Sequence, residues 1–185
     1  MRIVVGITGA SGAIFGIRAL EALCALDVET HLILSKWARS TIAHETAMPL
    51  EELEKLASAV HHPDNQAAPL SSGSFKTDGM IIAPCSMKTL AAIRAGFGDS
   101  LICRAADVHL KERRKLVLLP RESPFSEIHL ENMLALSRMG AVIFPPIPAF
   151  YNHPQNVDDL IHHIVGRVLD QFGLDTPGLA RWSGF

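Results

Sequence analysis

The chain has 185 residues, of which 48% are hydrophobic and 19% are charged, and its formal net charge is -2. This length fits one domain with a sizeable core, and the near balance of charge argues against a general nucleic-acid binder. The small share of charged residues predicts that some apolar surface is buried between subunits.

The cysteines and the hydropathy pattern exclude further classes. Cys24, Cys85 and Cys103 form no CxxC pair, so they indicate neither a disulfide framework nor a zinc site. No apolar run is long enough to span a bilayer, and the start lacks a cationic flank followed by an apolar stretch. We therefore expect a cytoplasmic protein with no membrane partner.

The first predicted element is an apolar strand, Ile3 to Ile7, which runs into a turn of small residues before a helix at Ile14 to Leu26. Glycines at 6, 9 and 12 allow the backbone to approach a ligand closely. The N–H groups and dipole of a helix start attract an anion, so the turn predicts a phosphate cradle. Its GxxGxxG spacing departs from the dinucleotide fingerprint. The alternative is a tight strand–helix turn with no ligand.

Strand and helix patterns alternate along the rest of the chain. The further elements that we expect are a strand at Val28 to Leu34, a helix at Lys36 to Thr46, a helix after Pro49, a long connection at Ala57 to Asp78 with one short strand, a strand at Met80 to Ala83, a helix at Met87 to Ala95, a strand at Lys115 to Leu119, a helix at Ser126 to Met139, a strand at Ala141 to Phe144 and a helix at Val157 to Phe172. This alternation predicts an α/β fold with a doubly wound, mostly parallel sheet.

Polar residues follow the predicted strands at the points where they end. Because the carboxyl ends of parallel strands meet at one edge of a sheet, we expect a binding site at that edge. Hydroxyls and cations there suit a phosphorylated ligand, although helix N-capping would explain any single serine. The residues concerned are Ser11, Ser35, Ser86, Thr89, Lys88, Arg104, Lys111 and Arg121, with Tyr151 beyond the last strand.

Glu45 and Glu122 are the carboxylates that we expect to exchange a proton, although a surface role for Glu45 is an equal alternative. The KERRK run at 111–115 also fits a solvated charge run. The adjacent pairs His61-His62 and His162-His163 lack metal-ligand spacing, which favours surface or structural roles.

Several sequence blocks resemble the UbiX/phenylacrylic-acid-decarboxylase family, in the same order and over nearly the whole chain. PCSMKT and RAADVxLKERRKLVL are the most specific motifs, whereas the glycine turn alone is not specific. The blocks are GITGASGA (6–13), LSKWA (34–38), SGSF (72–75), MIIAPCSMKTLAAI (80–93), RAADVHLKERRKLVLLPRE (104–122), HLENML (129–134), GAVIFPPIPAFY (140–151) and GRVLDQFG (166–173).

This resemblance implies a flavodoxin-like (Rossmann-type) flavoprotein with a single domain over 1–185 and a C-terminal tail, about 174–185, that closes the site. It also implies a dodecameric flavin prenyltransferase, which joins a dimethylallyl group from dimethylallyl monophosphate to N5 and C6 of reduced FMN. The prenylated FMN would serve a separate UbiD-type decarboxylase.

The resemblance further assigns roles to residues of this chain. FMN would be held by Gly9, Ala10, Ser11, Ser35, Ser86, Met87, Lys88, Thr89, Arg104 and Arg121. The prenyl phosphate would be held by Tyr151 and Arg167, with charge added by Lys111 and Arg121. Trp182 would close the site, and Glu45 matches an acid near the phosphate. The residues expected to take part in the reaction are Glu45, Lys111, Glu122, Tyr151 and Arg167.

No metal is expected, because the sequence has no DDxxD-like acidic cluster and its basic residues can stabilise a leaving phosphate. By resemblance, Tyr151, Arg167 and Trp182 complete the site of a neighbouring subunit.

Four other functions remain possible on the sequence. A direct decarboxylase of phenolic or cinnamic acids would use the same flavin site. A peptidyl-cysteine decarboxylase shares the fold but carries a PASANT-like segment, where this chain has PCSMKT. A non-catalytic FMN carrier would give no reason for Tyr151, Arg167 and Lys111 to converge. An NAD-dependent dehydrogenase is disfavoured by the glycine spacing.

Overall fold

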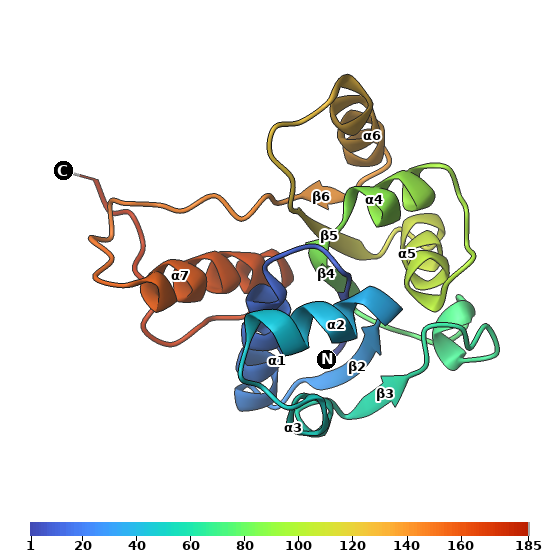
Figure 1. Cartoon of the computed structure of the whole chain (residues 1–185), viewed down its shortest axis with the longest axis horizontal. Coiled ribbons are helices and arrows are strands. Elements are labelled where there is room, and N and C mark those ends of the chain that lie inside the picture. The colour runs from blue at the N-terminus through green and yellow to red at the C-terminus, as the bar shows by residue number, and fades with distance from the viewer. Residues whose placement is uncertain (185) are drawn as a thin grey trace.

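The computed structural model describes residues 1–184 and places a six-stranded parallel sheet between two layers of helices (Figure 1). The strands are β1 Arg2–Ile7, β2 Glu29–Leu34, β3 Ala59–His61, β4 Gly79–Cys85, β5 Lys115–Pro120 and β6 Val142–Ile143. The helices are α1 Ala13–Ala25, α2 Lys36–Glu45, α3 Leu50–Lys55, α4 Met87–Arg94, α5 Leu101–Lys111, α6 Glu127–Arg138 and α7 Val157–Leu169, with the 3-10 turns η1 Pro69–Ser71 and η2 Asp170–Phe172.

The strand order β3-β2-β1-β4-β5-β6 confirms the predicted doubly wound fold. Without the short edge strand β3, the order of the other five strands is that of flavodoxin. β1 lies between β2 and β4, and the chain order reverses at the β1–β4 pair. Doubly wound sheets bind ligands outside the carboxyl ends of the strands at this point.

Alternating side chains of β1 bury themselves on opposite faces of the sheet. Ile3 and Val5 pack in the core beneath α1, α2, α3 and α7, whereas Val4 packs in the core beneath α4, α5 and α6. Since both faces are covered, β4 is buried throughout and β1 is buried and apolar after its first residue, Arg2, as their sequences indicated.

Most predicted elements are present, with ends within a few residues of those expected. Helix α5 is the main omission: its segment, Leu101–Lys111, received no assignment from the sequence, although Ser100 caps its first turn and its apolar side is buried. The predicted strand at Ala141 to Phe144 is shortened to β6, because prolines follow at 145, 146 and 148.

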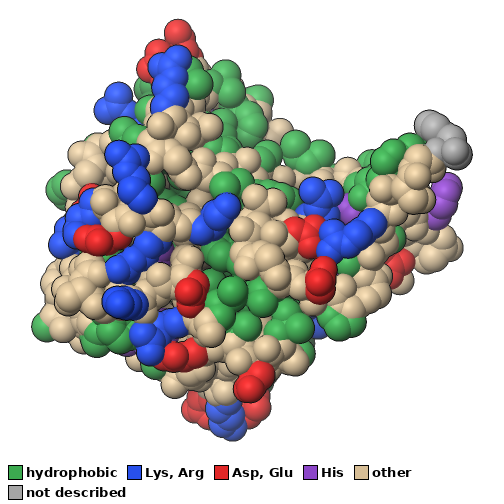
Figure 2. Space-filling model, turned by 180° about the vertical axis from the view of Figure 1, so that it is seen from behind, with side chains coloured by type: hydrophobic (Ala, Val, Ile, Leu, Met, Phe, Trp, Pro, Cys, Tyr) green, Lys and Arg blue, Asp and Glu red, His purple; other side chains and the backbone are tan. Residues whose placement is uncertain are grey.

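The chain between β6 and α7 extends away from the body of the molecule and lies near the C-terminal tail (Figure 1). We call residues 144–156 the arm. Ile147 and Phe150 are 72% and 68% exposed on it. Figure 2 shows hydrophobic side chains on the surface from the upper lobe, which α6 forms, to the arm. Within residues 1–184, no helix has the length and apolar character needed to cross a membrane.

Gly16 allows α1 to pack closely on the sheet. A Cβ at this position would lie 2.3 Å from the carbonyl oxygen of Ala83, at the end of β4. This oxygen belongs to the backbone and cannot turn away, and the Ile7 side chain lies 2.8 Å from the same position, so glycine is required here because of close contact and not because of its φ.

We predict that Gly16→Ala destabilises the protein by about 1–2 kcal/mol, because a 2.3 Å contact puts overpacking at the upper end of its usual cost of about 1–3 kcal/mol, while helix propensity returns about 1 kcal/mol. Urea unfolding would measure the change. Gly6→Ala is the matched control, since its Cβ would meet the nearest side-chain atoms at an ordinary 3.5 Å. Equal stability of Gly16→Ala and wild type would contradict the close packing.

Candidate functional site

The ends of β1 and β4 are joined by the side chain of Thr8. Its Oγ1 donates to the carbonyl oxygen of Pro84 at 2.7 Å and accepts from the backbone N–H of Ser86 at 2.9 Å. Thr8 is 1% exposed, so both hydrogen bonds are shielded from water. They fix the loop that begins α4 against the loop that follows β1.

A cavity of 840 Å³ opens beside this junction, at the carboxyl ends of β1, β2 and β4. The cavity thus lies at the edge of the sheet where the sequence predicted a binding site. Five residues that the sequence assigned to cofactor binding line it: Gly9, Ser35, Ser86, Lys88 and Thr89.

Three helices begin at this cavity, each capped by a serine that lines it. Ser35 Oγ accepts from Ala38 N at 3.1 Å in α2, and Ser86 Oγ accepts from Thr89 N at 3.3 Å in α4. Ser100 Oγ accepts from Cys103 N at 3.3 Å in α5. These serines cap their helices and also line the cavity, so capping does not exclude ligand binding there. The helix N-termini bring positive potential to the cavity. Lys88, in the first turn of α4, adds a full charge.

The start of α1 already holds an internal carboxylate. Glu45 Oε2 accepts from the backbone N–H groups of Gly12 at 2.8 Å and Ala13 at 3.1 Å. Gly12 adopts φ 95°, a left-handed conformation suited to glycine. The sequence predicted a phosphate cradle at this turn, and the structure places Glu45 on two of its N–H groups.

Glu45 is held in its ionised form by these neighbours. Partial burial raises the pKa of Glu45, but a hydrogen bond from Ser11 and those from the two amides lower it. The charge of Arg121 lowers it further, and the net pKa lies below the ordinary value of 4.5. The fold thus brings Ser11, Glu45 and Arg121 together, as their predicted roles require.

Arg121 and Glu122 follow β5 at the same edge of the sheet. The backbone N–H of Arg121 donates to the carbonyl oxygen of Cys85 at 3.2 Å, and the side chain is exposed. Glu122 is also exposed, and its Oε1 accepts from the N–H of Ser123 at 3.2 Å.

Lys111 does not share this edge, so the sequence-based placement was wrong. It ends α5 immediately before β5 begins, and α5 runs antiparallel to the strands, so Lys111 lies at the amino ends of the strands, paired with Glu112. Arg104 lies in α5 near its start but outside the cavity lining, where it pairs with Asp107 at 2.7 Å and donates to Ser71 O at 3.1 Å.

Three of the five predicted donor-binding residues, Tyr151, Arg167 and Trp182, lie on the arm, α7 and the C-terminal tail, apart from Lys111 and Arg121. The Tyr151 hydroxyl, on the arm, lies 2.9 Å from His163 Nε2 in α7, and the Tyr151 and Trp182 rings meet at 5.6 Å. Arg167, one turn after His163, pairs with Asp170 at 3.1 Å. In the described part of the chain, the 840 Å³ cavity is lined by none of Tyr151, Arg167 or Trp182.

Sequence reasoning missed several residues of the cavity wall. Trp37 and Phe97 line it and are 69% and 61% exposed, which leaves two aromatic faces open. A Cβ at Gly9 would lie 2.3 Å from Trp37 Cβ, so the glycine turn and α2 are in close contact. Arg39 also lines the cavity and pairs with Glu54 at 2.9 Å. The LSKWA block was the available signal for Trp37.

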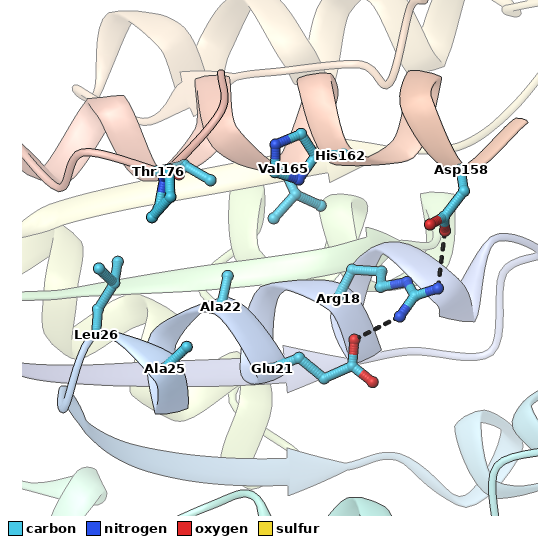
Figure 3. Close-up of a pocket in the computed structure, with 10 residues that line it drawn as sticks. Arg18, Glu21, Ala22, Ala25, Leu26, Asp158, His162, Val165 and Thr176 are labelled. Atoms are coloured by element: carbon cyan, nitrogen blue, oxygen red, sulfur yellow. Dashed lines mark hydrogen bonds and ion pairs between the residues drawn. The ribbon is translucent and has the colours of Figure 1, made fainter. Parts of the chain in front are cut away.

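A second cavity of 370 Å³ lies between α1, α7 and the C-terminal tail (Figure 3). Arg18 crosses one end of it, with ion pairs of 2.8 Å to both Glu21 and Asp158. His162 and Val165 project into it from α7 (Figure 3). None of the predicted site residues within 1–184 lines this cavity. Across the same range, no group of three or more His, Cys, Asp or Glu side chains is arranged to hold a metal ion.

Comparison with known proteins gives full-length matches. The Flavoprotein family matches residues 1–169. A probable UbiX-like flavin prenyltransferase of Streptomyces sp. (strain D7) is 62% identical over 100% of this chain and 92% of its own length.

Two solved structures also match this chain over its whole length. A dodecameric FMN-dependent UbiX-like decarboxylase from Escherichia coli O157:H7 is 62% identical, with a TM-score of 0.98 and coverage of 100% of both chains. AnUbiX (PadA1), solved in complex with FMN and dimethylallyl pyrophosphate, is 59% identical with a TM-score of 0.98, over 100% of this chain and 98% of that chain.

The carboxylate at the start of α1 gives a prediction for acid stability. Because the pKa of Glu45 is lowered on folding, its ionised form stabilises the protein above pH 4.5, and this contribution is lost as the pH falls through the folded pKa. Glu45→Gln should therefore be less stable than wild type at pH 7, with the difference shrinking below about pH 4.

Chemical unfolding at several pH values would measure this difference. Glu131→Gln, on the exposed surface of α6, is the control and should show no such pH-dependent difference. A stability gap for Glu45→Gln that persists unchanged in acid would contradict the role of its charge.

Proposed function

This chain belongs to the flavoprotein family, as a UbiX-like flavin prenyltransferase, and we propose that its residues join a dimethylallyl group from dimethylallyl monophosphate to N5 and C6 of reduced FMN. It is an FMN-dependent enzyme. The observation that carries this proposal is the 840 Å³ cavity where three helices begin. The match over the whole chain to a protein solved with FMN and a dimethylallyl donor supports it.

The residues of the cavity fit FMN. The volume lies within the range of about 300–1,000 Å³ that is typical of ligand pockets. The helix starts and Lys88 suit a terminal phosphate, while the exposed faces of Trp37 and Phe97 suit a flat aromatic ring. We assign FMN binding to the cavity residues Gly9, Ser35, Ser86, Lys88 and Thr89, with Ala10, Ser11, Met87, Arg104 and Arg121 around them.

Reduced FMN supplies the electron-rich acceptor of the prenyl group. Loss of phosphate from an allylic carbon leaves a delocalised cation, so the protein must stabilise the departing anion. Arg167 and Arg121 are suited to bind that phosphate, and Tyr151 offers a hydroxyl. Glu45, ionised beside Ser11 and Arg121, is placed to accept a proton rather than to donate one. Glu122, exposed at the same edge, is the second candidate for proton exchange.

We place the donor site between subunits. Tyr151, Arg167 and Trp182 are grouped on the arm, α7 and the tail, outside the lining of their own chain's cavity. The exposed apolar side chains of the arm and α6 suit an oligomer, and the relative from E. coli O157:H7 is a dodecamer. In such an assembly, these residues, with the tail at about 174–185, close a neighbour's cavity. Residue 185 lies outside the described residues.

Lys111 fits this arrangement only across a subunit boundary, because it lies at the opposite edge of the sheet from its own chain's cavity. We further propose that the product serves a UbiD-type decarboxylase. A cytoplasmic location is supported by the three free thiols, Cys24, Cys85 and Cys103.

The test of function is mass spectrometry of the flavin after wild type is incubated with reduced FMN and dimethylallyl monophosphate. We expect a flavin heavier by one dimethylallyl group, formed equally well in EDTA because arginines supply the charge that magnesium would bring. An unchanged flavin, or activity that needs added magnesium, would contradict the proposal. Carbon dioxide released from a cinnamic acid by wild type alone would instead support a direct decarboxylase.

Arg167 separates donor binding from flavin binding. Arg167→Ala should retain FMN while prenyl transfer falls by roughly 10- to 100-fold, because a charge-assisted phosphate contact contributes about 1.5–3 kcal/mol. Flavin absorbance and the rate of product formation would measure the two properties. Arg18→Ala is the matched control and should keep both FMN and activity, since Arg18 also forms ion pairs, at 2.8 Å to Glu21 and Asp158, but is not among the predicted site residues. Loss of FMN in proportion to activity in Arg167→Ala would contradict the assignment.

A further inference from the structure

His163 is the buried partner of Tyr151. It is 6% exposed in α7, and its Nε2 lies 2.9 Å from the Tyr151 hydroxyl, with the two rings edge to face at 5.5 Å. The adjacent His162 is exposed and lines the second cavity (Figure 3). The two histidines thus face different surroundings, although the pattern of residues predicted a surface or structural role for both.

The other neighbours of His163 define its hydrogen bonds. The backbone carbonyl of Ala180, in the tail, is hydrogen-bonded to the ring. Since a carbonyl only accepts, a ring N–H faces Ala180, and in the neutral ring Nε2 accepts the Tyr151 hydroxyl hydrogen. Tyr151 then has no hydrogen left for a phosphate.

A protonated His163 removes this conflict. It donates from one ring nitrogen to Ala180 and from Nε2 to the Tyr151 oxygen, so the hydroxyl hydrogen is free to turn outward. We propose, on the premise of the proposed function, that His163 is a positioning residue that takes up a proton from water when the prenyl phosphate binds and so directs the Tyr151 hydroxyl to that phosphate.

The charges around His163 support this response. Burial lowers the pKa of His163, and the neighbouring charges of Arg167 and His162 on α7 lower it further, so the ring is neutral without donor. The Ala180 carbonyl and Asp170, in η2, act in the opposite direction. A phosphate dianion bound by Arg167 and Tyr151 would offset the arginine charge and favour the protonated ring.

The test is the pH dependence of KM for dimethylallyl monophosphate at saturating reduced FMN, from about pH 6.5 to 9. If one proton is taken up on binding, KM rises by up to about tenfold for each unit by which the pH increases. The amide of His163→Gln donates to the Tyr151 oxygen at every pH, so this variant should bind the donor well without that rise. Tyr151→Phe lacks the hydroxyl that His163 would direct, so its KM should also rise less steeply with pH.

His162→Leu is the matched control: it leaves the Tyr151–His163 contact intact and removes one charge that lowers the pKa of His163, so KM should rise as steeply as in wild type but from a higher pH. Ionisation of the substrate phosphate affects every variant alike and cancels in the comparison. FMN content and thermal unfolding establish that each variant is folded. If His163→Gln does not fold, His163→Asn is a second small polar replacement.

If KM rises equally steeply with pH in wild type and His163→Gln, the inference is overturned. It is also overturned if Tyr151→Phe keeps the steep wild-type rise. If wild type transfers no prenyl group at all, the proposed function fails first. Active wild type with parallel profiles leaves the function intact and rejects only the role of His163.

Discussion

The two hydrogen bonds of the Thr8 hydroxyl hold the ends of β1 and β4 together, and the cavity depends on this contact. Thr8 binds Pro84 O and Ser86 N, so one buried side chain fixes both loops that leave the centre of the sheet. Gly16 brings α1 onto β4 from the same side, where a Cβ would meet Ala83 O. Thr8 thereby fixes the loops at the cavity, and Gly16 allows α1 to pack against the neighbouring strand end.

The charge pattern around this floor is made largely from the backbone. The starts of α2, α4 and α5 face the cavity, whereas the start of α1 is neutralised by Glu45. An anion therefore finds positive potential at three helix starts and a carboxylate at the fourth. This division separates three helix starts that suit an anion from a fourth that already carries an ionised acid near Arg121.

The arm and tail provide what the cavity lacks. In residues 1–184 the aromatic and basic groups assigned to the donor are gathered around His163, apart from the chain's own cavity. Under the proposed function, a site divided in this way would give a physical reason for assembly, since the chain's own cavity receives no cation from α7. Assembly would also cover the exposed apolar side chains of the arm.

The sequence by itself determined the sheet, its carboxyl edge and the serines at the starts of α2 and α4. These follow from local signals: an apolar strand must be buried on both faces, and a serine after a strand caps the next helix. Ser35 and Ser86 were found for this reason, and Gly9 from the turn of small residues after the first strand. Tertiary structure alone decided that α5 begins at the cavity, that Lys111 lies at the far edge and that Trp37 and Phe97 form the wall. It also distinguished His163 from His162, because burial and partners depend on segments that are distant in sequence, and no local pattern encodes their contact.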